Sequence, residues 1–148
     1  MFGFGLVAVV AAAALGIDYG RAVTARKLLA NGADAAALAA ASRLPDAAAA
    51  RAAALAYIEK NIPSSEYGTV ADQNDVEVGS WDSESRTFTP ASDPNAAAVA
   101  VRVTAHLSEA RGNSLSMLFG SVLGREYVDI SASAVAGRGG PPCVIALD

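Results

Sequence analysis

The feature that most constrains this chain is an apolar run at residues 2–17, which continues without a proline into a helical pattern that reaches Leu44. The run contains no charged side chain. As an α-helix it spans roughly 24 Å, whereas the apolar core of a bilayer is about 30 Å thick. We therefore predict a membrane anchor at residues 1–17. No basic residue precedes the run, so a natural start upstream of Met1 explains its length better than local thinning of the membrane does.

Two other interpretations of the run stay open. A secretory signal peptide has an apolar region of similar length, but it carries positive charge before that region and a cleavage site followed by a break in pattern. Here the helical pattern continues through many alanines, which are the best helix formers. A buried alanine-rich helix is the third interpretation.

Downstream of the anchor, the pattern predicts two helices. The first helix ends before Pro45, because the residue before a proline is pushed out of the helical region, and its part at residues 18–44 forms a stalk. Asp46 caps a second, alanine-rich helix at residues 47–60. A polar loop follows at residues 63–74.

From Asp75 onward the apolar residues alternate with period two, as in half-buried strands. Four strands are expected, at residues 76–81, 86–89, 99–107 and 126–136. The third has Val99 and Val101 on its core face, and residues 114–123 have the apolar spacing of a short helix. The predicted fold class is α+β: a long membrane-spanning N-terminal helix, a second alanine-rich helix and an antiparallel sheet of about four strands, pilin-like in outline.

Composition limits both the size and the role of the folded part. With 148 residues, of which 53% are hydrophobic, the chain can build one modest core, which we place in a domain at residues 45–137. Residues 138–148 are expected to be a linker and the start of a truncated further region. The net charge of −4 argues against nucleic acid as a partner, because binding phosphates needs a basic face. The single Cys143 cannot form an internal disulfide and is expected to be inert.

No residue pattern predicts catalysis, a cofactor or a metal site. His106 lies in the middle of a strand, and no G-x-S-x-G elbow occurs. The acidic stretch at residues 72–77 lacks the glycine and the distal glutamate of a calcium loop. Residues 137–140 lack the Lys-Ser/Thr pair that follows the glycines of a phosphate-binding loop. We therefore predict that the protein is not an enzyme and has no cofactor.

The order of motifs along the chain resembles the TadE/TadG-like proteins of the tight-adherence (Flp) pilus-assembly system. The first half has G-x-D-Y-G-R-A at residues 16–22 and N-x-A-D-A-A-A-L-A-A-A at residues 31–41. The second half has V-x-V-G-x-W-D at residues 76–82, R-x-F at 86–88, P-N-A at 94–96 and V-R-V-T-A at 101–105, typical of a TadG-like body. The motif positions that we single out are Asp18, Tyr19, Gly20, Arg21, Asp34, Trp81, Asp82, Phe88, Asn95 and Arg102.

This resemblance implies a structural component of pilus assembly in the bacterial inner membrane, with a single span and the bulk of the chain outside the cytoplasm. Its expected partners are other pilus-assembly membrane proteins, the membrane itself and further copies of the chain. Counting basic residues implies the opposite topology, because Arg21, Arg26 and Lys27 follow the run. The resemblance also raises the question whether Asp148 begins a von Willebrand-type metal site.

Two alternatives to an assembly component stay open: a pilin-like subunit that polymerises through its N-terminal helix, and a tethered domain of unrelated role. Prepilin peptidases, in the families concerned, cut after a glycine followed at the fifth residue by glutamate. Gly3 and Gly5 are followed at that distance by Ala8 and Val10, so no such maturation is expected.

A stripe of small residues in the first helix is a candidate for a partner-binding face. Its members are Ala33, Ala36, Ala37, Ala40 and Ala41. Small side chains allow helices to approach closely, in a membrane or outside it. The stripe is covered either by a partner or, within one chain, by the second helix or the sheet.

Overall fold

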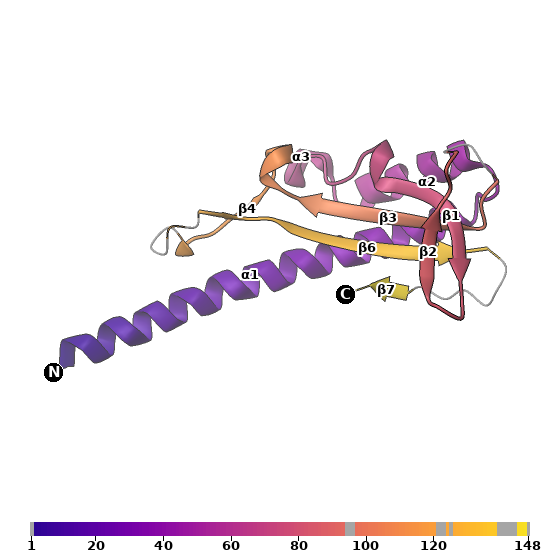
Figure 1. Ribbon diagram of the computed structural model, residues 1–148. Coiled ribbons are helices and arrows are strands. Elements are labelled where there is room, and N and C mark those ends of the chain that lie inside the picture. Colours follow the sequence, from indigo (N-terminus) through magenta and orange to yellow (C-terminus); the bar gives the residue numbers. More distant parts are fainter. Residues whose placement is uncertain (1, 94–96, 121–123, 125, 139–144, 148) are drawn as a thin grey trace.

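The computed structural model describes residues 2–93, 97–120, 124, 126–138 and 145–147. A single helix of 40 residues, α1 (Phe2–Ala41), runs along the molecule, and its N-terminal part projects beyond the sheet (Figure 1). In the part of the chain that the structure describes, none of the helices combines the length and the apolar content that crossing a membrane requires.

The second helix follows after a short turn, as predicted. Helix α1 ends at Ala41, before Pro45, and α2 (Ala47–Asn61) begins behind Asp46. The Asp46 carboxylate accepts a hydrogen bond of 2.9 Å from the backbone N–H of Ala49. This bond satisfies one of the free N–H groups in the first turn of α2.

The main sheet is antiparallel throughout, with the strand order β2-β1-β3-β6-β7. The first three expected strands are confirmed as β1 (Val76–Asp82), β2 (Thr87–Pro90) and β3 (Ala100–Leu107). The fourth, expected at residues 126–136, is divided: its main part is β6 (Ile130–Gly137) in this sheet, and its first residues form the separate strand β5 (Tyr127–Val128). A short strand, β7 (Ile145–Leu147), adds a fifth at the edge beside β6. The fold is therefore α+β.

The hairpin and the central strand differ little from expectation. Asp82 pairs with Thr87, so the loop between β1 and β2 consists of residues 83–86, one residue later than the loop at 82–85 that the expected strands imply. Strand β3 begins one residue later than predicted, and Val99, expected on the core face, is 53% exposed. The buried face of β3 instead begins at Val101.

Short elements connect these strands. Helix α3 (Ser64–Tyr67) and the 3-10 turn η1 (Gln73–Asp75) lie in the expected polar loop, and a second 3-10 turn, η2 (Glu109–Arg111), follows β3. A separate two-stranded ribbon consists of β4 (Leu115–Ser116) and β5 (Tyr127–Val128).

The short helix predicted at residues 114–123 is wrong for the residues described there. Residues 115–116 form β4, and Met117 donates its N–H to the carbonyl oxygen of Glu126 across the ribbon, at 2.8 Å. The N–H groups of Leu118 and Phe119 point to a side chain of α1. In a helix, these N–H groups would bond to backbone carbonyl oxygens of the same segment. Here they bond to groups outside it. Residues 121–123 lie outside the described residues.

The alanine stripe of α1 lies in the core. Ala33, Ala36, Ala37 and Ala40 are fully buried and Ala41 is 7% exposed, in one cluster with residues of α2 and the sheet. Fully buried Ala50 and Ala54 of α2 belong to the same cluster. The stripe is thus covered within one chain, and the interpretation as a partner-binding face is corrected, because neighbouring elements already fill that space.

Two glycines allow unusually close packing. A Cβ at Gly32 would lie 2.5 Å from Cδ1 of Ile62, so glycine lets the end of α2 approach α1. On the outer face of the sheet, a Cβ at Gly79 would overlap the carbonyl oxygen of Thr89 and lie 3.0 Å from the Phe88 ring. Phe88, at 8% exposure, belongs to a small second cluster with Ala100, Val135 and Trp81.

We predict that Gly79→Ala lowers the free energy of unfolding by about 1–3 kcal/mol, because the new methyl group overlaps backbone that must shift. Gly20→Ala is the matched control, since nothing lies within 4 Å of its added Cβ. That control should leave the free energy unchanged or raise it by up to about 1 kcal/mol, as alanine favours helix. Urea unfolding followed by circular dichroism measures both, and equal effects would contradict the prediction.

Candidate functional site

Two residues of the G-x-D-Y-G-R-A motif join α1 to the β4–β5 ribbon. The Asp18 side chain is 1% exposed. Its Oδ1 accepts a hydrogen bond from the N–H of Leu118 at 2.8 Å, and its Oδ2 accepts one from Phe119 at 2.9 Å. Nearly one turn further along α1, Nη1 of Arg21 donates to the carbonyl oxygen of Ser116 at 2.8 Å. The motif therefore holds a segment about a hundred residues away in sequence.

The electrostatics of Asp18 favour its charged form. Burial raises its pKa. Hydrogen bonds from the backbone N–H groups of Phe119, Leu118 and Gly120, together with the nearby charge of Arg21, lower the pKa by more than burial raises it. The net result is a pKa below the ordinary value of 3.8. An ionised carboxylate that accepts backbone donors on both oxygens acts as a structural clamp on the segment that carries those donors.

Two further residues of this motif, Tyr19 and Gly20, face away from the clamp. Tyr19 is 72% exposed, and it borders an open groove of about 330 Å³ with Ala22 of α1 and Val128 of β5. Gly20 has open space where a side chain would be. Neither residue has a packing role within the described part of the chain that explains its identity.

Asp34 lies on α1 among the buried alanines. Its Oδ1 is buried and has no hydrogen-bond partner among the described residues. Burial raises the pKa of this carboxyl group above its ordinary value. Asp34 therefore works against stability at neutral pH, in contrast to Asp18.

The remaining described motif positions stabilise the β1–β2 hairpin and the outer face of the sheet. Asp82 accepts hydrogen bonds from the Ser85 hydroxyl at 2.6 Å and the Glu84 N–H at 2.9 Å, and these bonds lower its pKa. The Arg102 guanidinium lies 4.8 Å from the centre of the Phe88 ring. Trp81 pairs with Phe88 across the hairpin.

Arg102 also bonds to the strand beside it. Its Nε donates to Oε2 of Glu77 at 2.7 Å, in a directly opposed pair between β3 and β1. Asn95 lies outside the described residues, as do Cys143 and Asp148.

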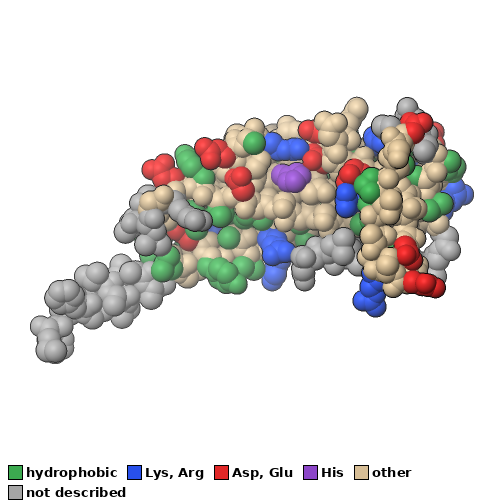
Figure 2. All heavy atoms as spheres, in the orientation of Figure 1, with side chains coloured by type: hydrophobic (Ala, Val, Ile, Leu, Met, Phe, Trp, Pro, Cys, Tyr) green, Lys and Arg blue, Asp and Glu red, His purple; other side chains and the backbone are tan. Residues whose placement is uncertain are grey.

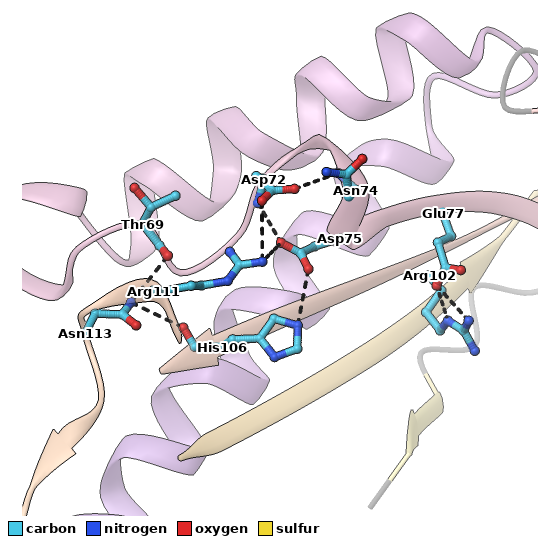
Figure 3. A network of polar contacts seen from close by, with 9 residues as sticks. All are labelled: Thr69, Asp72, Asn74, Asp75, Glu77, Arg102, His106, Arg111 and Asn113. Carbon is cyan, nitrogen blue, oxygen red and sulfur yellow. Dashed lines mark hydrogen bonds and ion pairs between the residues drawn. The ribbon is translucent and has the colours of Figure 1, made fainter. Parts of the chain in front are cut away.

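A polar network binds the loop before β1 to the end of β3 (Figure 3). Asp75 is its centre: Oδ2 lies 2.6 Å from Nη2 of Arg111, and Oδ1 lies 3.2 Å from Nε2 of His106. Asp72 accepts a hydrogen bond of 2.7 Å from the N–H of Asn74. Asp72 and Asp75 of the acidic stretch considered for calcium thus bind groups of the chain itself. In the described part of the chain, no three His, Cys, Asp or Glu side chains gather as a metal site would require.

Asn113 completes this network from the chain segment after η2. Its Nδ2 donates to the carbonyl oxygens of Tyr67 and Thr69, at 3.1 and 3.3 Å, and its Oδ1 accepts from the N–H of Ser108. Gly68 has φ +69, and a Cβ there would lie 2.9 Å from Cβ of Asn113. Arg111, Asn113 and Gly68 were missed in the sequence, because no local pattern links residues some 40 positions apart.

The comparison with family models confirms the resemblance to the Flp pilus-assembly system. The family model described as Tad-like Flp pilus-assembly matches residues 11–136. Neither the curated proteins nor the solved structures contain a match.

We predict that Asp18→Asn releases the ribbon, because an amide offers one acceptor oxygen where two N–H groups need one each. Hydrogen exchange at the Leu118 and Phe119 amides should accelerate on the order of tenfold or more at neutral pH. Asp82→Asn is the control, since its contacts lie within the β1–β2 turn. Unchanged exchange in Asp18→Asn would show that the clamp contributes nothing.

The same clamp gives a pH dependence with a definite sign. The folded pKa of Asp18 lies below 3.8, so its contribution is fully present above that pH and is lost as the pH falls through the folded value. The amide resonances of Leu118 and Phe119 should therefore stay constant from neutral pH down to about 4 and change only below it. Asp18→Asn should abolish this change.

We predict the opposite effect at Asp34. Its folded pKa is raised, so its contribution to stability is present below pH 3.8 and is lost as the pH rises through the folded value. Asp34→Asn should therefore raise the melting temperature at pH 7 and have no effect near pH 3. Thermal unfolding at the two pH values measures this difference, and a lower melting temperature at pH 7 would overturn the prediction.

Proposed function

The chain belongs to the Tad-like Flp pilus-assembly family, and we propose that it is a membrane-anchored structural component of the assembly machinery that acts through protein–protein contacts. The observation that carries this proposal is the division of α1 into two parts. Residues 2–17 have no charge, and the part after Asp18 is packed in the α+β core. One helix therefore joins an apolar projection to a folded domain (Figure 1).

The contacts of the motif residues support a structural role. Asp18, Arg21, Asp82 and Arg102 all bind groups of the chain itself. The His106 side chain faces Asp75, which Arg111 also engages. These groups position backbone and side chains, which is the chemistry of a scaffold.

For its location, we propose the bacterial inner membrane, with a single span formed by the run at residues 2–17 and the domain outside the cytoplasm. The uncharged composition of the run supports the span. The likeness to TadG-like proteins supports the orientation, against the basic residues Arg21, Arg26 and Lys27 that follow the run. Partners on this proposal are other pilus-assembly membrane proteins.

The test uses the full chain expressed in cells that contain the assembly system. Wild-type protein should sediment with inner membranes, and a phosphatase fused after Leu44 should be active outside the cytoplasm. Val9→Lys combined with Val10→Lys should release the protein from the membrane, because each charge in the span costs about 3 kcal/mol. The matched control places the same two charges at exposed Thr87 and Thr89 of β2.

Co-purification then distinguishes an assembly component from a polymerising pilin. Recovery of other assembly components with the wild-type chain supports the proposal. Recovery of the chain as the main subunit of sheared filaments would instead identify a polymerising pilin. A phosphatase fusion that is made but inactive, as expected in the reducing cytoplasm, would reverse the proposed orientation.

A further inference from the structure

Exposed apolar side chains gather at one level of the molecule, where the projecting part of α1 meets the domain (Figure 2). The described residues include nine large hydrophobic side chains that are exposed, and six of them belong to this level. We call these six residues the collar: Leu15, Ile17, Tyr19, Leu118, Phe119 and Tyr127. The three others lie elsewhere: Leu38 near the C-terminal end of α1, Tyr57 on α2 and Val99 just before β3.

The Asp18 clamp brings the two halves of the collar together. Leu118 is 59% exposed although its backbone N–H is held 2.8 Å from the Asp18 carboxylate. The loop after β4 therefore stands beside the helical turn that carries Leu15 and Tyr19, with its own side chains directed outward. A loop that had no external contact would gain nothing by exposing two large apolar residues there.

The collar and the small exposed residues between its members together surround the helix on every side. At about 100° per residue, the exposed positions 13, 15, 16, 17, 19 and 20 cover three sides of α1. The fourth side carries Ala14 and Asp18 and is covered by the loop, which presents Leu118 and Phe119 instead. A protein partner or a second copy would cover one side, whereas a bilayer surrounds an inserted helix on all of them.

Along α1, charge follows the same boundary, although Glu126 and Asp129 are exposed beside Tyr127 on the neighbouring segment. Every exposed residue from 13 to 20 is uncharged, and Asp18, the single charged residue among them, is 1% exposed. Beyond it, Arg21 is half-buried, and the exposed charges of α1 begin at Arg26, eight residues or about 12 Å from Asp18 along the helix axis. Tyrosine at 19 and 127 suits the interfacial layer, where an aromatic ring can meet both lipid and water.

We propose that the collar lies in the interfacial layer of the bilayer, with Leu118 and Phe119 inserted beside α1 as a second, non-spanning membrane contact. This inference rests on the proposed anchor at residues 2–17. Asp18 and Arg21 then act as positioning residues, which hold the loop at the membrane level. With contacts at the helix and at the loop, the domain has one fixed tilt against the membrane.

The test places one fluorescent reporter at a time in the full chain, in a Cys143→Ser background that removes the natural thiol. Phe119→Cys, labelled with an environment-sensitive dye, is reconstituted in phosphatidylcholine–phosphatidylglycerol vesicles that contain spin-labelled quencher lipids. We expect blue-shifted emission and at least twofold stronger quenching by lipids labelled near the headgroup than in the control. The matched control is Val99→Cys, which is exposed at the other end of the sheet and should show neither effect.

Val9→Cys separates failure of this inference from failure of the anchor. Quenching at both Val9→Cys and Phe119→Cys supports the collar. Quenching at Val9→Cys alone overturns the collar and leaves the anchor standing, and quenching at neither overturns both. A shift at Phe119→Cys that depends on protein density and is insensitive to quencher lipids would identify a second copy as the occupant and overturn the proposal.

A further variant tests the positioning residue. Adding Asp18→Asn to the labelled chain should weaken lipid quenching at Phe119→Cys by at least half and leave quenching at Val9→Cys unchanged. Equal quenching at Phe119→Cys with and without Asp18→Asn would overturn the positioning role.

Discussion

The close approach of α1 to α2 and the sheet is the constraint on which the rest of the structure depends. Alanine side chains bury little area each, so a core made of Ala33, Ala36, Ala37 and Ala40 is stable only if the backbones lie near one another. Gly32 permits this by admitting Ile62 where a methyl group would lie. The valines of β1 and β3 then supply the larger apolar area on the other side of the same cluster. Without that approach, α1 beyond residue 18 would have no cover.

Backbone donors and acceptors that the sheet leaves free are taken up by a few side chains that connect distant segments. Asp18 accepts from Leu118 and Phe119, and Asn113 donates to Tyr67 and Thr69. Each of these side chains supplies hydrogen-bond partners that a helix or a sheet would otherwise supply, because a buried or half-buried backbone group needs a partner. They also help to hold the ribbon and the loop before β1, whose Val70 and Ala71 are buried in the main apolar cluster.

The sequence predicted the elements better than it predicted their contacts. Period-two alternation located β1, β2, β3 and β6, and Pro45 with Asp46 located the boundary between the two helices. The segment after Asn113 was mistaken for a helix, since apolar spacing does not show that the N–H groups of Leu118 and Phe119 bond to Asp18. The alanine stripe was recognised, but what covers it depends on how the chain folds back. Likewise, the resemblance pointed to Asp18 and Arg21 as motif positions, but only the structure shows that both bind the segment at residues 116–119.

Helix α1 is continuous, so it fixes the distance between the apolar run and the folded domain. From Asp18 to Ala41 it extends about 35 Å without a break, because each residue adds about 1.5 Å. The sheet packs along this part of the helix, so its distance from the end of the apolar run is set by a rigid element and by no linker. The Asp18 clamp prevents the ribbon from moving independently at the near end. The outer face of the sheet, with Phe88, Arg102 and Glu77, is therefore held at a fixed distance from the apolar run at residues 2–17. A structural component of an assembly needs such a fixed distance.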